Sequence, residues 1–345
     1  MSNFFERTKN VADGFVYFEV IDSTQNYARK ILADGCADGC ADGCADDCSN
    51  ICFVKRQDEM PAIYVVAACH QTAGKGRLCR KWVSKPFESL LASFATILPS
   101  SIVKNPSYNG WLPIIAGLAA RDSIIGALKE FGATQIENGE LPDYSEISLK
   151  WPNDIFIGDC KEGGVLTEIV LTPKTVAGDI ADPNVGVIFG IGLNLFMDKQ
   201  SLPIEEATSL KMHYDNLPDF AELGDNIAAR LVENLRIRLG KFVKNTNEYS
   251  LDLLKEASEA CWTLGRKVIV RAPNDDGLGI DAGVDDSNHA DAYDVGAKSF
   301  TSVEGVAQNL MRDASIQVRK DSGQIIKDSG QIITVRTGDV CAVRI

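Results

Sequence analysis

The hydrophobic and polar positions along the chain follow two periods, which separate predicted strands from predicted helices. Runs rich in apolar, aromatic and β-branched residues predict strands at 15–20, 63–68, 89–98 and 185–195. Apolar residues at the helical period of 3.6 residues predict a long helix over 111–131. We expect its core face to carry Ile114, Leu118, Ile125 and Leu128.

Three further helices are predicted from caps and apolar stripes. The polar residues 22–24 can cap a helix that should end near Leu32, before Gly35. An amphipathic pattern predicts a long helix over 220–242 and a shorter one near 251–260. These helices should complete one large domain.

The segment 147–171 has the pattern of a β meander. A strand ends at the sequence Lys150-Trp151, the residues Pro152-Asn153-Asp154 form a turn, and a second strand follows. A turn over 158–164 should then lead into a third strand over 165–171. We expect polar residues to be presented at both bends.

After Gly265 the pattern changes from long helices and strands to short strands. Short strands at 267–271, 302–308, 315–319, 332–336 and 340–345 predict a small β-barrel. We therefore expect one domain over 1–260 and a second over 261–345. An Asp- and Gly-rich insertion at 273–297 and an unchanged tandem copy of 320–326 at 327–333 should lengthen loops of the second domain.

A low-complexity repeat interrupts the first domain at 33–52. It spaces five cysteines by four residues: Cys36, Cys40, Cys44, Cys48 and Cys52. One interpretation is a metal or redox site, since such cysteines would share a helix face. We favour a mobile surface loop, because each glycine disfavours helix by about 1 kcal/mol and zinc sites usually have closer Cys pairs. The sequence leaves metal binding open.

Composition narrows the functional class. The formal net charge is −13, which argues against broad binding to nucleic acid or to an anionic membrane. The first residues lack the apolar core of a signal peptide, and we expect no apolar run of about 18 residues that could span a bilayer. We therefore expect a cytoplasmic protein without a nucleic-acid or membrane partner.

Candidate chemistry lies in a loop between the second and third predicted strands, Gln71 to Trp82. It combines two glycines, four cations and a terminal tryptophan: Gly74, Gly76, Lys75, Arg77, Arg80, Lys81 and Trp82. Glycine lets the backbone approach a ligand, and guanidinium groups match phosphate or carboxylate geometry. The pattern suits a nucleotide or another anionic ligand, although a solvated basic loop has the same composition.

Four stretches occur in a characteristic order. They are Asp-Ser-Thr-Gln-Asn at 22–26, the basic loop at 74–82, Lys-Trp-Pro-Asn-Asp at 150–154, and Lys-Glu-Gly-Gly-Val-Leu-Thr-Glu at 161–168. The most specific signal is the third stretch with a lysine seven residues after its last Asp. Together with Gly190–Asn194, these stretches make nearly the whole chain resemble the biotin protein ligase family, also called biotin acetyl-CoA-carboxylase ligases.

The resemblance implies a fold of the α/β (α+β) class. The expected catalytic domain has a mixed, largely antiparallel sheet with helices, as in class II synthetase-like biotin ligases, and an SH3-like β-barrel follows it. Some members carry an N-terminal winged-helix DNA-binding domain. Because only about twenty residues precede the Ser23-Thr24 motif, we expect neither that domain nor a repressor role.

Two positions depart from the family pattern. Lys75 stands where the family usually has arginine, so it keeps the charge but loses the bidentate fork. Cys79 stands where the family has glycine, and a Cβ there costs on the order of 1 kcal/mol if the position requires a positive φ. We expect loop closure to differ from the family at this point.

The resemblance also implies roles for individual residues. The catalytic set is Lys161, Arg77, Arg80, Lys150 and Asp154. The biotin-binding set is Ser23, Thr24, Gln25, Gln71, Gly74, Lys75, Gly76, Arg77, Lys161 and Gly190. The ATP-binding set is Arg80, Trp82, Asn153 and Asn194. No protein-held metal is expected, because Mg2+ would arrive with ATP. Ordinary roles compete with these: Ser23 and Thr24 can cap a helix, and Trp82 can be a core residue.

The implied reaction has two halves. Biotin is first joined to AMP, and the biotinyl group then passes to a lysine of the biotin carboxyl carrier domain of an acyl-CoA carboxylase. Lys161, Arg77 and Arg80 would neutralise the repulsion between carboxylate and phosphate. Two alternatives remain open: a lipoate or octanoate ligase or transferase of the same fold, and a non-catalytic biotin-binding regulatory protein. The sequence does not decide between monomer and homodimer.

Overall fold

The computed structural model describes residues 4–34, 58–137, 139–170, 182–273, 300–320, 332–336 and 339–342. Three expectations fall mainly outside these residues: the cysteine repeat, the Asp- and Gly-rich insertion and the tandem copy.

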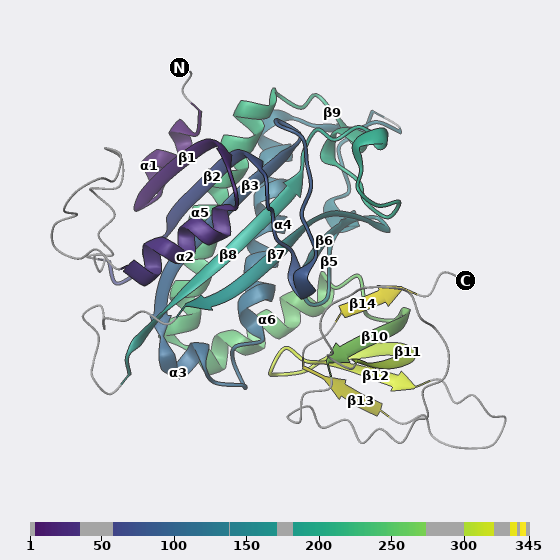
Figure 1. Ribbon diagram of the computed structural model, residues 1–345. Helices are drawn as coiled ribbons and strands as arrows, with labels where there is room; N and C mark the ends of the chain where they lie inside the picture. Colours follow the sequence, from purple (N-terminus) through teal and green to yellow (C-terminus); the bar gives the residue numbers. More distant parts are fainter. Residues whose placement is uncertain are drawn as a thin grey trace.

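Seven strands form the large sheet, in the order β1-β2-β3-β8-β7-β6-β5 (Figure 1). Their bounds are β1 Gly14–Ile21, β2 Tyr64–Gln71, β3 Ser89–Pro99, β5 Ile147–Lys150, β6 Asp154–Ile157, β7 Cys160–Val170 and β8 Asn184–Asn194. The β1 and β2 strands pair in parallel, and every other neighbouring pair is antiparallel. The predicted mixed, largely antiparallel sheet is confirmed.

Helices cover the two faces of this sheet unequally (Figure 1). The long helices α4 (Trp111–Phe131), α5 (Phe220–Lys244) and α6 (Thr246–Glu259) lie on one face. The other face carries α2 (Thr24–Asp34) near one end of the strands. Neighbouring residues of β2 point to opposite faces of the sheet: Val65 packs in the core on the α4 side, and Val66 packs against α2 on the other side. The α2 face is the one on which the predicted site residues gather.

Helix α4 corrects one expectation. By length and composition Trp111–Phe131 could cross a bilayer, although we expected no such segment. In the fold, 72% of its most apolar window is buried. It contacts α5 on one side and strands β5 to β8 on the other, and a helix enclosed in this way is apolar over most of its circumference.

Several short elements were not predicted. Helix α1 (Glu6–Val11) is anchored on α5, because the backbone N–H groups of Arg7 and Thr8 each donate to the Asp225 carboxylate at 2.8 Å. The other unpredicted elements are α3 Ser100–Val103, the paired β4 Thr134–Gln135 and β9 Tyr214–Asp215, and 3-10 turns at Arg77–Cys79, Tyr144–Glu146, Lys199–Ser201 and Leu210–Met212.

Five strands form a second, antiparallel sheet in the order β13-β12-β11-β10-β14 (Figure 1). Their bounds are β10 Lys267–Pro273, β11 Phe300–Leu310, β12 Ile316–Lys320, β13 Ile332–Val335 and β14 Asp339–Ala342. All five strands were predicted. The closure of this sheet into an SH3-like barrel, and the domain boundary at 260, stay predictions.

The segment that joins the two sheets runs along the edge of the large one. The backbone N–H of Leu149 donates to the Ala260 carbonyl, and the N–H of Trp262 donates to the Leu149 carbonyl, both at 2.8 Å. The Trp151 N–H donates to the Thr263 hydroxyl at 2.9 Å. Because these bonds form a parallel bridge, the joining segment is fixed against β5.

Candidate active site

A β-bulge on β7 decides where Lys161 points. Ile155 pairs with Gly163, but Phe156 pairs with Lys161, so Glu162 is an extra residue on β7. Ile155 faces the core beside α4. Without the bulge, strand alternation would put Lys161 on that same core face. The bulge instead places it on the open face, opposite Phe156.

The predicted turn at 158–164 is therefore wrong for most of its length. The chain reverses at Gly158, whose φ is 57°, and β7 begins two residues later at Cys160. Glycine is suited to that left-handed conformation. The motif that begins at Lys161 consequently lies in a rigid strand. The bulge escaped the sequence analysis because strand alternation alone does not reveal an inserted residue.

Lys161 and Asp154 form the central ion pair. The Lys161 Nζ lies 2.7 Å from Asp154 Oδ1, and their side chains are 25% and 12% exposed. The Lys161 backbone is fixed as well, because its N–H donates to the Glu206 carbonyl and its carbonyl accepts from Thr208 N–H, both at 2.7 Å. The ammonium is therefore held in place yet remains open to the sheet face.

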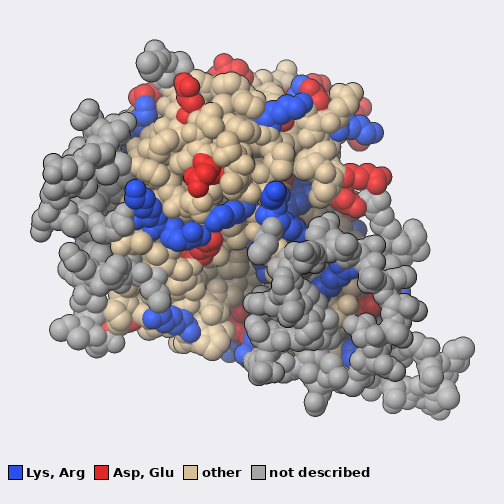
Figure 2. Space-filling view, in the orientation of Figure 1, with Lys and Arg blue, Asp and Glu red and all other residues tan. Residues whose placement is uncertain are grey.

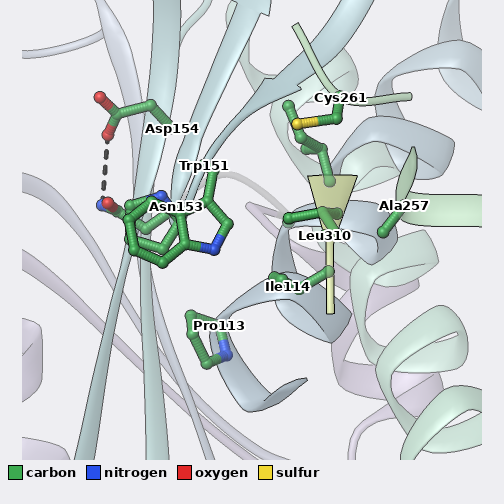
Figure 3. Close-up of a pocket in the computed structure, with 11 residues that line it drawn as sticks. Pro113, Ile114, Trp151, Asn153, Asp154, Ala257, Cys261 and Leu310 are labelled. Carbon is green, nitrogen blue, oxygen red and sulfur yellow. Dashed lines mark hydrogen bonds between the residues drawn. The ribbon is translucent and has the colours of Figure 1, made fainter. Parts of the chain in front are cut away.

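The turn between β5 and β6 extends this cluster. The Asn153 side-chain amide donates to Asp154 Oδ1 at 3.2 Å and to the Val165 carbonyl at 3.0 Å, and Asn153 Oδ1 accepts from Arg77 Nη1 at 2.8 Å. Arg77, Asn153, Asp154 and Lys161 thus form one connected set. Figure 3 shows Asn153 and Asp154 at a small, mainly apolar pocket whose other walls include α4 and α6 residues.

Glycines form the floor between the strands. On the open face, Gly192 of β8 is paired with Gly164 of β7, which is paired with Asp154. A Cβ on Gly192 would lie 2.7 Å from the Trp82 ring, and one on Gly164 would lie 3.3 Å from Asp154 Oδ1. The indole of Trp82 therefore rests directly on the β8 backbone. Because Gly192 and Gly164 have no side chains, neither of them separates the Trp82 indole from the Lys161 cluster.

The basic loop forms a small hairpin over this floor. Gly76 N–H donates to the Arg80 carbonyl at 2.7 Å, and Trp82 N–H donates to the Gly74 carbonyl at 3.0 Å. A Cβ on Gly74 would lie 2.5 Å from the Trp82 carbonyl oxygen, so glycine is needed for the hairpin itself. The positive φ of the turn, 53°, falls at Leu78, one residue before the position at which we considered strain.

Cations of the hairpin lie on the surface. Lys75, Arg80 and Lys81 are exposed. The Lys75 ammonium donates to Asn26 Oδ1 of α2 at 2.6 Å, which ties the hairpin to the start of that helix. Figure 2 shows a band of Lys and Arg side chains across this side of the molecule, although the net charge of the chain is −13. The band gives the site a local positive field.

A network of polar side chains lies beside the hairpin. Gln71 Oε1 accepts from the Thr24 backbone N–H at 2.8 Å and from the Thr24 hydroxyl at 3.1 Å. The Thr24 hydroxyl also bonds Ser93 Oγ at 2.9 Å, and Ser93 donates to Gln25 Oε1 at 3.1 Å. A Cβ on Gly190 would lie 2.3 Å from that Gln25 oxygen. Strands β2, β3 and β8 and helix α2 meet here.

Ser93 is the member that the sequence analysis missed. It is fully buried in β3, a strand that we described only as apolar. Its register opposite Gly190 places it on the open face, and a polar residue in that register was the available signal. Ser23, which the sequence analysis assigned to the biotin-binding set, is only 1% exposed. Its hydroxyl has no hydrogen-bond partner among the described residues. The hydroxyl is therefore available to a ligand.

Asn194 differs from the other predicted site residues. Its side chain is 3% exposed, its Nδ2 donates to the Thr208 carbonyl at 2.9 Å, and its Oδ1 accepts from Ser89 Oγ at 3.3 Å. Both ends of the amide are thus engaged within the protein. Its predicted contact with adenine stays a prediction, as do the ligand roles of the other site residues.

Glu162, the bulged residue, is a buried acid beside the site. Its side chain is fully buried, and neither carboxyl oxygen has a hydrogen-bond partner in the described part of the chain. Burial raises the pKa of this carboxyl well above its ordinary value, and the nearby backbone N–H of Asn194 opposes the shift only weakly. Burial therefore disfavours the charged form of Glu162 in the folded chain.

Comparison with known proteins identifies the relatives of the chain. The model of the biotin/lipoate A/B protein ligase family matches residues 53–180. The biotin acetyl-CoA-carboxylase ligase of Mycobacterium tuberculosis is 30% identical over 248 residues, which cover 71% of this chain and 79% of that protein. The bifunctional ligase/repressor BirA of Escherichia coli is 29% identical over 175 residues, which cover 50% of this chain and 44% of the relative. The match thus covers less than half of that relative.

Solved structures agree on the fold. The biotin protein ligase from Aquifex aeolicus in complex with biotin and ATP superposes with a TM-score of 0.52 at 20% identity, over 96% of this chain and 99% of that one. Another crystal structure of the Aquifex aeolicus ligase gives a TM-score of 0.52 at 16% identity, over 96% and 100% of the two chains. These structures show the fold, and the Mycobacterium relative shows that the chain belongs to the biotin protein ligase family.

Proposed function

We propose that this chain is an ATP-dependent biotin ligase, which activates biotin as biotinyl-5′-AMP and transfers it to a lysine of a biotin carboxyl carrier domain. The observation that carries the proposal is the position of Lys161. The bulge sets its ammonium on the open face, 2.7 Å from Asp154 and in the same bonded set as Arg77. Two cations thus converge where a carboxylate and a phosphate would have to meet.

In the first half-reaction, the biotin carboxylate oxygen attacks the α-phosphorus of ATP, and pyrophosphate leaves. Both reactants are anions, so positive groups must lower their repulsion and stabilise the charge that spreads over the phosphate oxygens. Lys161 and Arg77 would supply these groups, with Arg80 at the exposed side of the hairpin. Because their partners Asp154 and Asn153 already orient Lys161 and Arg77, little reorganisation is required.

The head group of biotin would lie in the polar network. A ureido group carries two N–H donors and one carbonyl acceptor, and Ser23, Thr24 and Gln71 present hydroxyls and an amide within one small region. Ser93 would hold the Thr24 and Gln25 side chains in their orientations. The hairpin residues Gly74, Lys75 and Gly76 would cover the bound ligand.

The nucleotide would lie on the glycine floor. Trp82, which rests on Gly192, offers its other ring face to adenine, and Gly164 leaves the sheet surface beside it low. Mg2+ usually reaches such a site with the triphosphate and takes one or two carboxylates from the protein. Asp154 fits that requirement, because its carboxylate lies on the open face beside Asn153. The ion would neutralise phosphate charge.

In the second half-reaction, the lysine amine of the carrier attacks the acyl carbon of biotinyl-AMP, and AMP leaves. The mixed anhydride must be protected from water until then, and closure of the Gly74–Trp82 hairpin would exclude it. The relative from Mycobacterium tuberculosis is named for acetyl-CoA carboxylase, and we propose the carrier domain of such a carboxylase as partner. Cytoplasmic location and a monomeric or homodimeric state are part of the same proposal.

One assay separates this function from its alternatives. The purified chain is incubated with Mg-ATP, an apo carrier domain and either biotin, lipoate or octanoate. Biotinyl-AMP and a biotin-labelled carrier should form with biotin alone. Labelling by lipoate or octanoate would favour the alternative ligases. Saturable biotin binding without adenylate or labelled carrier would favour a non-catalytic biotin-binding protein. Omission of ATP is the matched control.

A further inference from the structure

Four side chains contact one another in succession from the β5-β6 turn to the start of the second sheet, and we call this set the aromatic stack, although its two rings are tilted by 49°. The Lys150 ammonium lies 5.2 Å from the centre of the Phe156 ring, and the Phe156 and Trp262 rings are 5.0 Å apart. The Arg266 guanidinium lies 4.2 Å from the centre of a Trp262 ring. Cations and aromatic faces attract at such distances, so the line is a continuous set of favourable contacts.

Trp262 and Arg266, the two members that belong to the joining segment, also bond the tip of the β6-β7 hairpin. Trp262 Nε1 donates to Asp159 Oδ1 at 2.9 Å, and Arg266 Nη2 lies 3.0 Å from that oxygen. Asp159 is two residues before Lys161. The Arg266 and Asp159 side chains are 46% and 72% exposed, and an ion pair so exposed adds little to stability. Its effect is to restrain the hairpin that carries Lys161.

Phe156 connects this stack to the proposed chemistry. It is the direct cross-strand partner of Lys161, and it lies two residues after Asp154 on the same strand face. Lys150 is the direct partner of Asp154 on the other side. The ring therefore lies between the two lysines. A shift of Phe156 would change the space available to both ammonium groups.

We propose that Trp262 and Arg266 are positioning residues for adenylate formation, which act on Lys150 and Lys161 through Phe156 and Asp159. The inference rests on the proposed ligase function. It also explains why the segment after α6 is bonded along β5 at Leu149 and Trp151, since this pairing fixes the indole relative to the catalytic turn. Neither residue contacts the reacting atoms in this assignment.

The kinetic test compares Trp262→Leu, Trp262→Phe and Arg266→Ala with Arg319→Ala, which removes an exposed arginine from β12 of the second sheet. Active sites are counted from the burst of adenylate. We expect kcat for adenylate formation per active site to fall about tenfold in Trp262→Leu, because small displacements of catalytic groups are costly. The KM for biotin should not change, and Arg319→Ala should match the wild type. Trp262→Phe keeps an aromatic ring but loses the bond to Asp159, so its kcat should lie between those of Trp262→Leu and the wild type.

A second measurement does not depend on catalysis. Trace acetylation of the native protein, followed by mass spectrometry, reports the reactivity of each lysine amine. Trp262→Leu removes the ring that packs against Phe156, so Phe156 can move away from the Lys150 ammonium, and the acetylation rate of Lys150 should rise about threefold. The rate at exposed Lys211 should stay constant.

The outcomes separate the two proposals. If the wild type forms no biotinyl-AMP but Lys150 still responds to Trp262→Leu, the ligase function fails and the stack is real. If adenylation proceeds normally in Trp262→Leu and Arg266→Ala, or if their kcat per active site equals that of Arg319→Ala, the positioning role is wrong. Unchanged acetylation of Lys150 in Trp262→Leu also overturns it.

Discussion

Asp154 accepts a hydrogen bond from Lys161 at 2.7 Å across two neighbouring strands, and the contact exists because one extra residue is inserted before Gly163. A regular ladder would turn the lysine into the core, where an ammonium is costly. The bulge therefore links a local irregularity of the backbone directly to the charge that the proposed reaction requires.

The first prediction concerns this lysine. Lys161→Ala should lower the rate of adenylate formation by about a hundredfold or more, because removal of a preorganised charged donor at a reacting phosphate costs about that much. The free energy of unfolding should fall by about 1–3 kcal/mol, because the largely buried Asp154 carboxylate loses its ammonium partner, and the variant should still fold. The rate is measured as pyrophosphate release, and stability by urea unfolding.

Lys211→Ala is the matched control, since Lys211 forms an exposed ion pair with Asp198. Its adenylation rate should equal that of the wild type. An equal loss of rate in the two variants would mean that the general positive field, rather than the position of Lys161, is responsible.

Much of the fold could be predicted from the hydrophobic pattern of the sequence. The long helix at 111–131, the strands at 89–98 and 185–195 and the C-terminal strands have strong periodicity, and each appears in the structure. Helix α6 was predicted too short, because its first turn, at Thr246, follows directly after the end of α5. Short elements such as α1 were missed because their stability comes from tertiary bonds to Asp225 rather than from local sequence.

The site was predictable in its parts but not in its connections. Motif order pointed to Lys161, Asp154 and Arg77, and the structure bonds them through Asn153. Ser93 was not found, because a single serine in an apolar strand carries no signal until its cross-strand partner is known. The contacts of Trp262 depend in the same way on a register that only the folded chain defines.

Two neighbouring glycines of β8 give the second prediction, because each lies under a different part of the site. A Cβ at Gly190 meets Gln25 Oε1 at 2.3 Å, whereas one at Gly192 meets the Trp82 ring at 2.7 Å. Overpacking of this kind costs about 1–3 kcal/mol, which corresponds to roughly tenfold or more in binding. Gly190→Ala should raise the KM for biotin, and Gly192→Ala the KM for ATP.

Each glycine variant is the control for the other. Steady-state kinetics with one substrate varied and the other saturating gives the four KM values needed. If both variants raise the same KM, the assignment of biotin to the polar network and of ATP to the Trp82 floor is wrong.

The third prediction tests the residue that sequence reasoning missed. Ser93→Ala removes hydrogen bonds to Thr24 and Gln25 and should weaken biotin binding about tenfold, as measured by isothermal titration calorimetry. Ser123→Ala is the control, because Ser123 is a buried serine on α4 that bonds the Ala119 carbonyl on the other side of the sheet. It should lose about 1 kcal/mol of stability and bind biotin normally. Equal biotin affinity in both variants would remove Ser93 from the site.

The fourth prediction uses the buried acid of the bulge. Burial raises the folded-state pKa of Glu162, so the unfolded chain releases this proton at a lower pH than the folded one. At a pH between the two pKa values, Glu162 is charged in the unfolded chain and neutral in the folded one. A rise in pH within this range therefore favours the unfolded state. The wild-type stability should therefore fall with increasing pH across this window, by at most about 1.4 kcal/mol per pH unit from this group.

Glu162→Gln keeps the shape of the side chain and removes the titration. The stability of the variant relative to the wild type should increase as the pH rises from the ordinary carboxyl pKa near 4.5 toward 7. Urea unfolding of both proteins at several pH values gives the difference directly. A difference that does not vary with pH would show that Glu162 titrates alike in both states. The substitution keeps the inserted residue of the bulge, so Lys161 should stay on the open face. The adenylation rate of Glu162→Gln at neutral pH should therefore stay close to that of the wild type.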